Sequence, residues 1–187
     1  MSQTTLDIKE PGLNVLPPGV ERHVVNAGGL TGLQIFPDDE IEIINDEGNQ
    51  ICEIICFDKD GKSENGILNL KENAKESFIK EILLRKDESS LITNLQLKKR
   101  NLNINKSKSS ILFDDNTPSG EKIKIKSKDK CYVIFSAPQN DMLVSDQNPS
   151  SDLTIFIKRA KIINDKELSI IPDPMYEPNY EKNIDRE

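Results

Sequence analysis

The chain has 187 residues, of which 30% are charged and 35% hydrophobic, and its net charge is −7. That is enough for one domain with a sizeable core, with or without a long tail, and it excludes a wholly disordered protein. The acidic balance argues against general binding to nucleic acids or to anionic membranes, because phosphates attract the opposite charge.

The sequence also predicts a compartment. No apolar run approaches the length of a membrane span, and residues 1–20 lack the basic and apolar blocks of a signal peptide. With three cysteines and no export signal, we expect a cytoplasmic protein with reduced thiols and no membrane partner.

The first two strands are expected on either side of a glycine turn. Residues 1–20 are rich in proline and glycine and predict an extended arm. Glu21–Ala27 and Leu30–Phe36 predict strands that Gly28-Gly29 joins. These glycines do not predict a dinucleotide-binding loop, because a β-rich run follows where such a loop needs a helix.

A central hairpin is expected next, from Glu40–Ile44 and Gln50–Phe57. The residues between these runs are Asn, Asp, Glu and Gly, a composition that suits a tight turn, and Gly48 is expected to have a positive φ. The second run is apolar on both faces, as in a strand inside a sandwich or barrel. We therefore expect this hairpin at the centre of the sheet.

One amphipathic helix is expected at about residues 71–85. Asn69 is a candidate for its N-cap, and the apolar stripe at helical spacing comprises Ala74, Phe78, Ile79, Ile82 and Leu83. We expect this helix to pack across a sheet face or a barrel mouth. Leu91–Leu97 predicts a further strand, and residues 98–110 predict a polar loop or weak hairpin tip.

The second half of the domain predicts three strands. Lys122, Lys124 and Lys126 alternate with two isoleucines, which indicates a half-buried strand with a lysine face. Such a face usually protects an edge strand from aggregation, and the alternative is a site that holds an anion. The other two strands are expected at Cys131–Ala137 and Leu153–Ile157.

The fold class is therefore mainly β: a sandwich or barrel of short antiparallel strands with one amphipathic helix. We divide the chain into an extended N-terminal arm at 1–20, a β domain at 21–163 and an extended C-terminal tail or linker at 164–187. The tail combines prolines, charges and isolated apolar residues, so we expect it to order only against another surface.

No catalytic group stands out. A hydrolase triad needs a base, an orienting carboxylate and a nucleophile in reach, so the only histidine, His23, is expected to be structural or exposed. Cys52 and Cys56 on one strand would lie roughly 13 Å apart. That is too far for a disulfide and awkward for a shared zinc, which would also require Cys131 and His23 from distant strands. We expect buried thiols and no metal.

Two sets of motifs resemble known families. The first resembles the urea carboxylase-associated family: Gly28-Gly-Leu-Thr-Gly32, Pro37-Asp-Asp-Glu-Ile-Glu-Ile-Ile-Asn-Asp-Glu-Gly-Asn-Gln50 and Phe57-Asp-Lys-Asp-Gly61. The second is similar to the N-terminal domain of large aminomethyltransferases: Phe135-Ser-Ala-Pro138, Asn148-Pro-Ser-Ser-Asp-Leu-Thr-Ile-Phe-Ile-Lys-Arg-Ala160 and Ile171-Pro-Asp-Pro174. The His-Asp pair and the Asn-Cys element expected of catalytic members have no match in this sequence.

The resemblance implies a non-catalytic N-terminal-type domain or subunit of a folate-dependent, glycine-cleavage T-protein-like aminomethyltransferase in one-carbon or amine metabolism. It implies a hetero-complex in which tetrahydrofolate binds the aminomethyltransferase-like partner rather than this chain. Glu47, Gln50 and His23 are the candidate ligand-binding residues. The alternatives are an amidohydrolase of the carboxyguanidine deiminase type and a small-molecule-binding β-barrel with Gln50 at its mouth.

Overall fold

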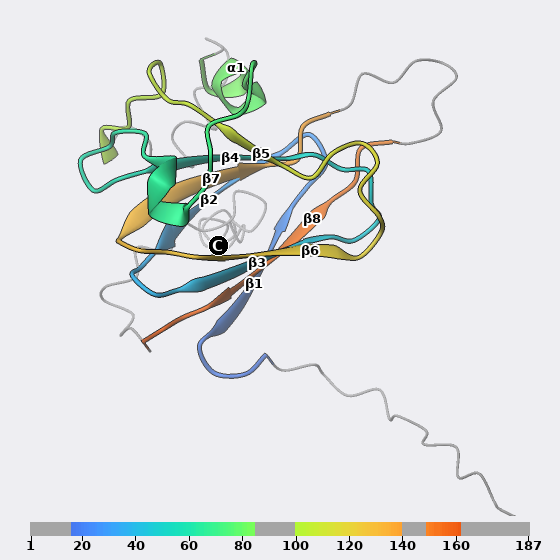
Figure 1. Cartoon of the computed structure of the whole chain (residues 1–187), viewed down its shortest axis with the longest axis horizontal. Coiled ribbons are helices and arrows are strands. Elements are labelled where there is room, and N and C mark those ends of the chain that lie inside the picture. Colours follow the sequence, from blue (N-terminus) through green and yellow to red (C-terminus); the bar gives the residue numbers. More distant parts are fainter. Residues whose placement is uncertain (1–15, 85–99, 140–148, 162–187) are drawn as a thin grey trace, which may run out of the picture.

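The computed structural model describes residues 16–84, 100–139 and 149–161 and shows two stacked antiparallel sheets (Figure 1). The first sheet has the order β1 (Val20–Val25), β8 (Leu153–Lys158), β3 (Glu40–Asn45), β6 (Glu121–Lys126). The second has the order β2 (Leu30–Ile35), β7 (Cys131–Ser136), β4 (Cys52–Phe57), β5 (Ser110–Leu112). This is the strand order of an eight-stranded jelly roll, so the mainly β prediction is confirmed as a sandwich and not as a closed barrel.

The predicted central hairpin is wrong in its pairing. β3 pairs with β6 and β8, whereas β4 pairs with β5 and β7 in the other sheet. The turn between them does reverse the chain, and Gly48 has the expected positive φ of 81°. However, turn chemistry sets a local reversal and not the sheet that the next strand enters. The same holds for β1 and β2, which Gly28-Gly29 joins across the two sheets.

The main core lies between the sheets. β4 and β7 are buried along their whole length, which confirms that the apolar run before Phe57 is an interior strand. The inner residues of β4 are Cys52, Ile54 and Cys56, which pack with the inner residues of the first sheet. Leu68 of the short 3₁₀ helix η1 (Asn65–Leu68) completes this core at one end.

The predicted helix is real but much shorter than expected. α1 runs from Phe78 to Leu84, and Ile79, Ile82 and Leu83 are its buried residues. It packs on the outer face of the second sheet, against Ile55, Phe57 and Ile134 (Figure 1).

The predicted helix start is wrong for a physical reason. The segment before α1 is too polar to bury a helical face, and the Ser77 hydroxyl accepts the Lys80 N–H at 3.2 Å at the true start. Asn69 instead ends η1 in a left-handed conformation with a φ of 57°.

The remaining expectations divide between confirmed strands and residues that the structure does not describe. The strands predicted at Lys122–Lys126, Cys131–Ala137 and Leu153–Ile157 match β6, β7 and β8, and β6 is an edge strand. The strand predicted at Leu91–Leu97, most of the N-terminal arm and the tail lie outside the described residues. Within the described ranges, no helix is long and apolar enough to cross a membrane.

Candidate functional site

The candidate ligand-binding residues of the β3–β4 turn do not share an environment. Gln50 is 1% exposed, and its amide nitrogen donates to the carbonyl oxygens of Ile51 and Pro138 at 2.9 and 3.0 Å. Its side-chain oxygen accepts the Ser151 N–H at 2.8 Å. Glu47, in contrast, is exposed. Gln50 therefore ties the turn to the segments before and after the β7–β8 connection, and its role toward a ligand stays a prediction, as does that of Glu47.

His23 belongs to a charged cluster at the β1 edge of the sandwich. Its Nε2 lies 3.1 Å from a Glu21 carboxylate oxygen. Arg159, just after β8, donates to both oxygens of Glu21 at 2.7 and 2.9 Å, to Asp39 at 2.7 Å and to the Gln34 carbonyl at 2.9 Å. Because a bidentate guanidinium fixes its carboxylates in position, this cluster holds β1, the β2–β3 turn and the end of β8 together.

The electrostatics of this cluster follow from its ion pairs, and a role of His23 toward a ligand stays a prediction. Burial alone would raise the pKa of Glu21, but hydrogen bonds from His23 and Arg159 outweigh it and lower that pKa to about 2. The side chains of Arg159 and Asp39 are 7% and 1% exposed. The second Asp39 oxygen accepts the Ala160 N–H at 3.0 Å. Neither Arg159 nor Asp39 was singled out as a site residue from the sequence, since nothing local links two residues 120 positions apart.

The three cysteines are free and buried, as expected. Cys131 lies next to Cys56. The hydrogen bond between the two thiols is the largest cause of the raised pKa of Cys56, and burial is the second. Burial likewise raises the pKa of Cys52. Among the described residues no group of three or more His, Cys, Asp or Glu side chains is arranged to hold a metal ion. The absence of a metal from the native protein stays a prediction.

A buried carboxylate lies between α1 and the second sheet. Glu53 is 1% exposed and accepts the Ile79 N–H at 3.0 Å through one oxygen. Its other oxygen and the hydroxyl of Ser136, which is directly opposite in the β4–β7 register, have no hydrogen-bond partner within the described part of the chain. The sequence contained a signal for this buried side chain, because Glu53 is the one charged residue of the otherwise apolar run at residues 51–57.

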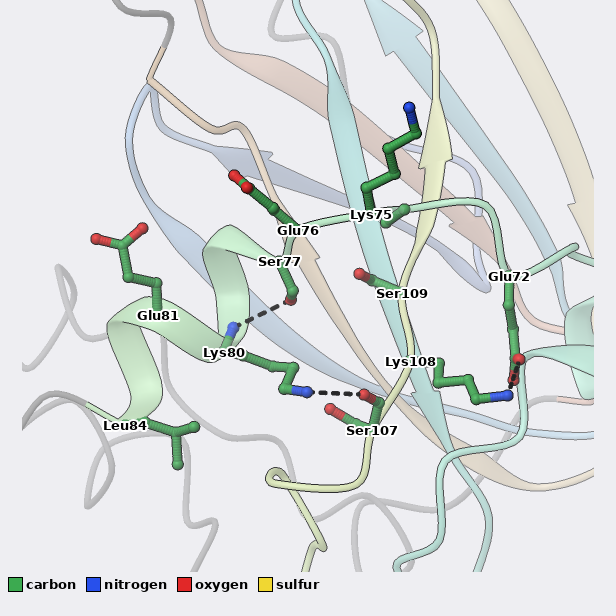
Figure 2. A pocket seen from close by; sticks show the side chains of 11 residues that line it. Glu72, Lys75, Glu76, Ser77, Lys80, Glu81, Leu84, Ser107, Lys108 and Ser109 are labelled. Atoms are coloured by element: carbon green, nitrogen blue, oxygen red, sulfur yellow. Dashed lines mark hydrogen bonds and ion pairs between the residues drawn. The ribbon is translucent and has the colours of Figure 1, made fainter.

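A groove of about 630 Å³ lies beside α1. Figure 2 shows the side chains that line it. Three lysines and three glutamates line it, together with serines from both walls. Lys108 pairs with Glu72 at 2.7 Å, and the Lys80 ammonium donates to the Ser107 carbonyl at 3.2 Å. Opposite charges are balanced along the groove and partly engaged with each other, so its chemistry favours no particular ligand.

A second hollow, of about 600 Å³, lies on the outer face of the first sheet. We call the outward residues that line it the lysine face: Val20, Glu40, Glu42, Ile44, Lys122, Lys124, Lys126, Phe156 and Lys158. Four lysines meet two glutamates here, in a chain whose net charge is −7. This hollow combines apolar surface with an excess of positive charge.

The comparisons with known proteins give one informative match. No protein-family model matches the chain. Over 171 residues the chain is 32% identical to a trimethylamine-oxide aldolase of Ruegeria pomeroyi, and the match covers 91% of this chain. The chain spans only about a fifth of that relative, 22% of its length.

This match corrects the expected function. The assignments to an aminomethyltransferase and, alternatively, to a carboxyguanidine-type amidohydrolase are wrong, because the relative that matches nearly the whole chain is an aldolase for trimethylamine oxide. The glycines of the first set of motifs lie in turns here, since Gly28, Gly48 and Gly61 all have positive φ, while the remaining motif residues include strands β3 and β8. Such glycines report how the backbone reverses, which unrelated chemistries share. The resemblance to the urea carboxylase-associated family and the expectation of tetrahydrofolate on a partner are not tested by this match.

Proposed function

We propose that this chain is the β-sandwich component of an enzyme that acts as a trimethylamine-oxide aldolase, and that it works together with a larger part that performs the reaction. The observation that carries the proposal is the 32% identity over 91% of the chain, against 22% of the relative. A component of this size accounts for one module of the relative, and the relative's remaining length provides room for a separate reacting centre.

The described side chains support a structural and assembling role. At the β1 edge and in the β3–β4 turn, the buried or half-buried candidate side chains are engaged in hydrogen bonds, whereas one oxygen of Glu53 and the Ser136 hydroxyl have no partner within the described residues. His23 contacts Glu21, Arg159 joins Glu21 to Asp39, and Gln50 joins the β3–β4 turn to Ser151. Arg159 and Gln50, held by several hydrogen bonds each, position the backbone of the segments that they join.

The experiment compares the chain alone with the chain in its native assembly. The full chain, affinity-tagged and expressed in its own source cells, is purified under mild conditions, and a second sample is purified from a foreign host. Both are assayed for consumption of trimethylamine oxide. We expect consumption by the native assembly and none by the chain alone. A native assembly that purifies with a stoichiometric partner and leaves trimethylamine oxide untouched would contradict the proposal.

A further inference from the structure

The lysine face is built as a grid by the strand register of the first sheet. Lys158 of β8 lies between Val20 and Glu40, and Glu40 is followed by Lys126. In the next row, Phe156 lies between Arg22 and Glu42, and Glu42 is followed by Lys124. In the third row Ile44 stands beside Lys122. Apolar side chains therefore lie among the charges, and half-buried Phe156 is near the middle.

The charges of this face are only partly neutralised. Lys126 pairs with Asp38 at 2.9 Å and Lys158 lies 3.7 Å from Glu40, but the other two lysines share one carboxylate. Lys122 and Lys124 both approach the same Glu42 oxygen, each at 3.8 Å. One carboxylate thus serves two ammonium groups, while these two lysine side chains remain 52% and 79% exposed. Exposed ion pairs of this kind contribute little to the stability of the fold. Protection of an edge strand accounts for the lysines of β6, but it does not account for the apolar hollow beside them.

The described helices leave this face free. α1 contacts β4 and β7 on the outer face of the second sheet (Figure 1), and η1 contacts β4 and contributes Leu68 to the core between the sheets. The outer apolar residues of that sheet have a partner in α1, whereas no described helix covers Phe156 on the first sheet.

From this arrangement we propose that the lysine face is the surface on which the chain docks an acidic partner polypeptide, namely the larger part of the aldolase assembly. The identity of the partner rests on the proposed function above. An apolar side chain of the partner fills the hollow at Phe156, and its carboxylates meet Lys122 and Lys124, whereas Lys126 is already paired with Asp38 at 2.9 Å. This is the usual layout of an interface, with an aromatic anchor at the centre and charges at the rim.

Two features favour a protein over a nucleic acid or a small anion. Glu40 and Glu42 stand within the face and repel a phosphate backbone, whereas a protein partner can place a lysine or arginine against them. A small anion would contact the lysines and leave the apolar hollow exposed to water. Charge complementarity to an acidic polypeptide, together with the apolar centre, accounts for both parts of the face.

The test removes the charges without creating repulsion. Lys122→Gln/Lys124→Gln is compared with Lys59→Gln/Lys62→Gln, an equal charge change at two exposed lysines of the turn after β4. Phe156→Ala is the apolar variant. Each full-length variant is tagged, expressed in the source cells and purified, and its urea midpoint confirms that it is folded. Partner yield, trimethylamine-oxide consumption and the size of the purified chain are then measured.

We expect the Lys122/Lys124 variant and the Phe156 variant to lose the partner by about tenfold or more, and the control to retain it. If the Lys122/Lys124 variant retains the partner, the proposed docking role of the lysine face is wrong. If that purified variant also consumes trimethylamine oxide, the proposed function still stands. A stoichiometric partner that needs the face but has no such activity supports the face and overturns the proposed function. Recovery of nucleic acid, pairing of the chain with itself through this face, or no stoichiometric partner overturns the inference.

Discussion

Replacing Arg159 by Met tests whether the charged cluster is a structural tie. The substitution keeps an apolar stem of similar length but removes the guanidinium that contacts Glu21, Asp39 and the Gln34 carbonyl. Asp39 is 1% exposed and would be left as a buried charge without its cation. Breaking a buried pair in this way costs about 3–5 kcal/mol of the free energy of unfolding.

Urea denaturation at neutral pH measures this loss directly. The expected cost is a large fraction of the roughly 5–15 kcal/mol that stabilises a domain, so the midpoint should fall by about 1–3 M. Lys158→Met is the matched control, because the neighbouring Lys158 is 70% exposed and lies 3.7 Å from Glu40. Its cost should stay within about 0.5 kcal/mol. Equal midpoints for Arg159→Met and Lys158→Met would refute the reasoning.

The same cluster predicts a pH dependence with a definite sign. The pKa of Glu21 is lowered from 4.5 to about 2 in the folded chain. A carboxylate with a lowered pKa stabilises the fold above its unfolded pKa, and this contribution is lost as the pH falls through the folded value. The difference in free energy of unfolding between wild type and Arg159→Met should therefore be largest above about pH 4.5. It should become smaller as the pH falls from 4.5 to 2.

Three further predictions follow from single buried positions. Gly48→Val should cost about 1–3 kcal/mol, because φ is 81° and a Cβ there would lie 2.7 Å from a backbone nitrogen; an unchanged urea midpoint would contradict this. Gln50→Leu should cost about 1–3 kcal/mol, since it leaves buried backbone groups unpaired, and a stability equal to wild type would remove the tie argument. The thiols of Cys52 and Cys56 should react with a disulfide reagent only after denaturation, because burial shields both and their pKa values are raised. Rapid labelling of the native chain, located by peptide mapping, would contradict their burial.

Most strand positions were predictable from the sequence because they depend on local patterns, whereas the three-residue strand β5 (Ser110–Leu112) was missed next to the predicted loop. The alternation around Lys124 and the apolar runs of β7 and β8 each report burial of a strand by itself. The Gly48 turn was predictable for the same reason, since a positive φ is a property of a few residues.

Strand partners were not predictable, because pairing depends on residues far apart in the chain. In a jelly roll most consecutive strands enter opposite sheets, so the turn after β3 looks like a hairpin turn without forming one. The Arg159 cluster escaped for the same reason, since it joins residues of β1, the β2–β3 turn and the end of β8. The sequence predicted lysines on one face of a single strand. Only the strand register of the structure shows that Phe156 of β8 lies among those lysines.

The central claim is that this chain belongs to an assembly that consumes trimethylamine oxide. Deleting its coding sequence in the source cells and following trimethylamine oxide in the medium tests that claim most directly. The account predicts that consumption stops and that the wild-type chain restores it, whereas the Lys122→Gln/Lys124→Gln chain restores it poorly. Undiminished consumption by the deletion strain would contradict the account.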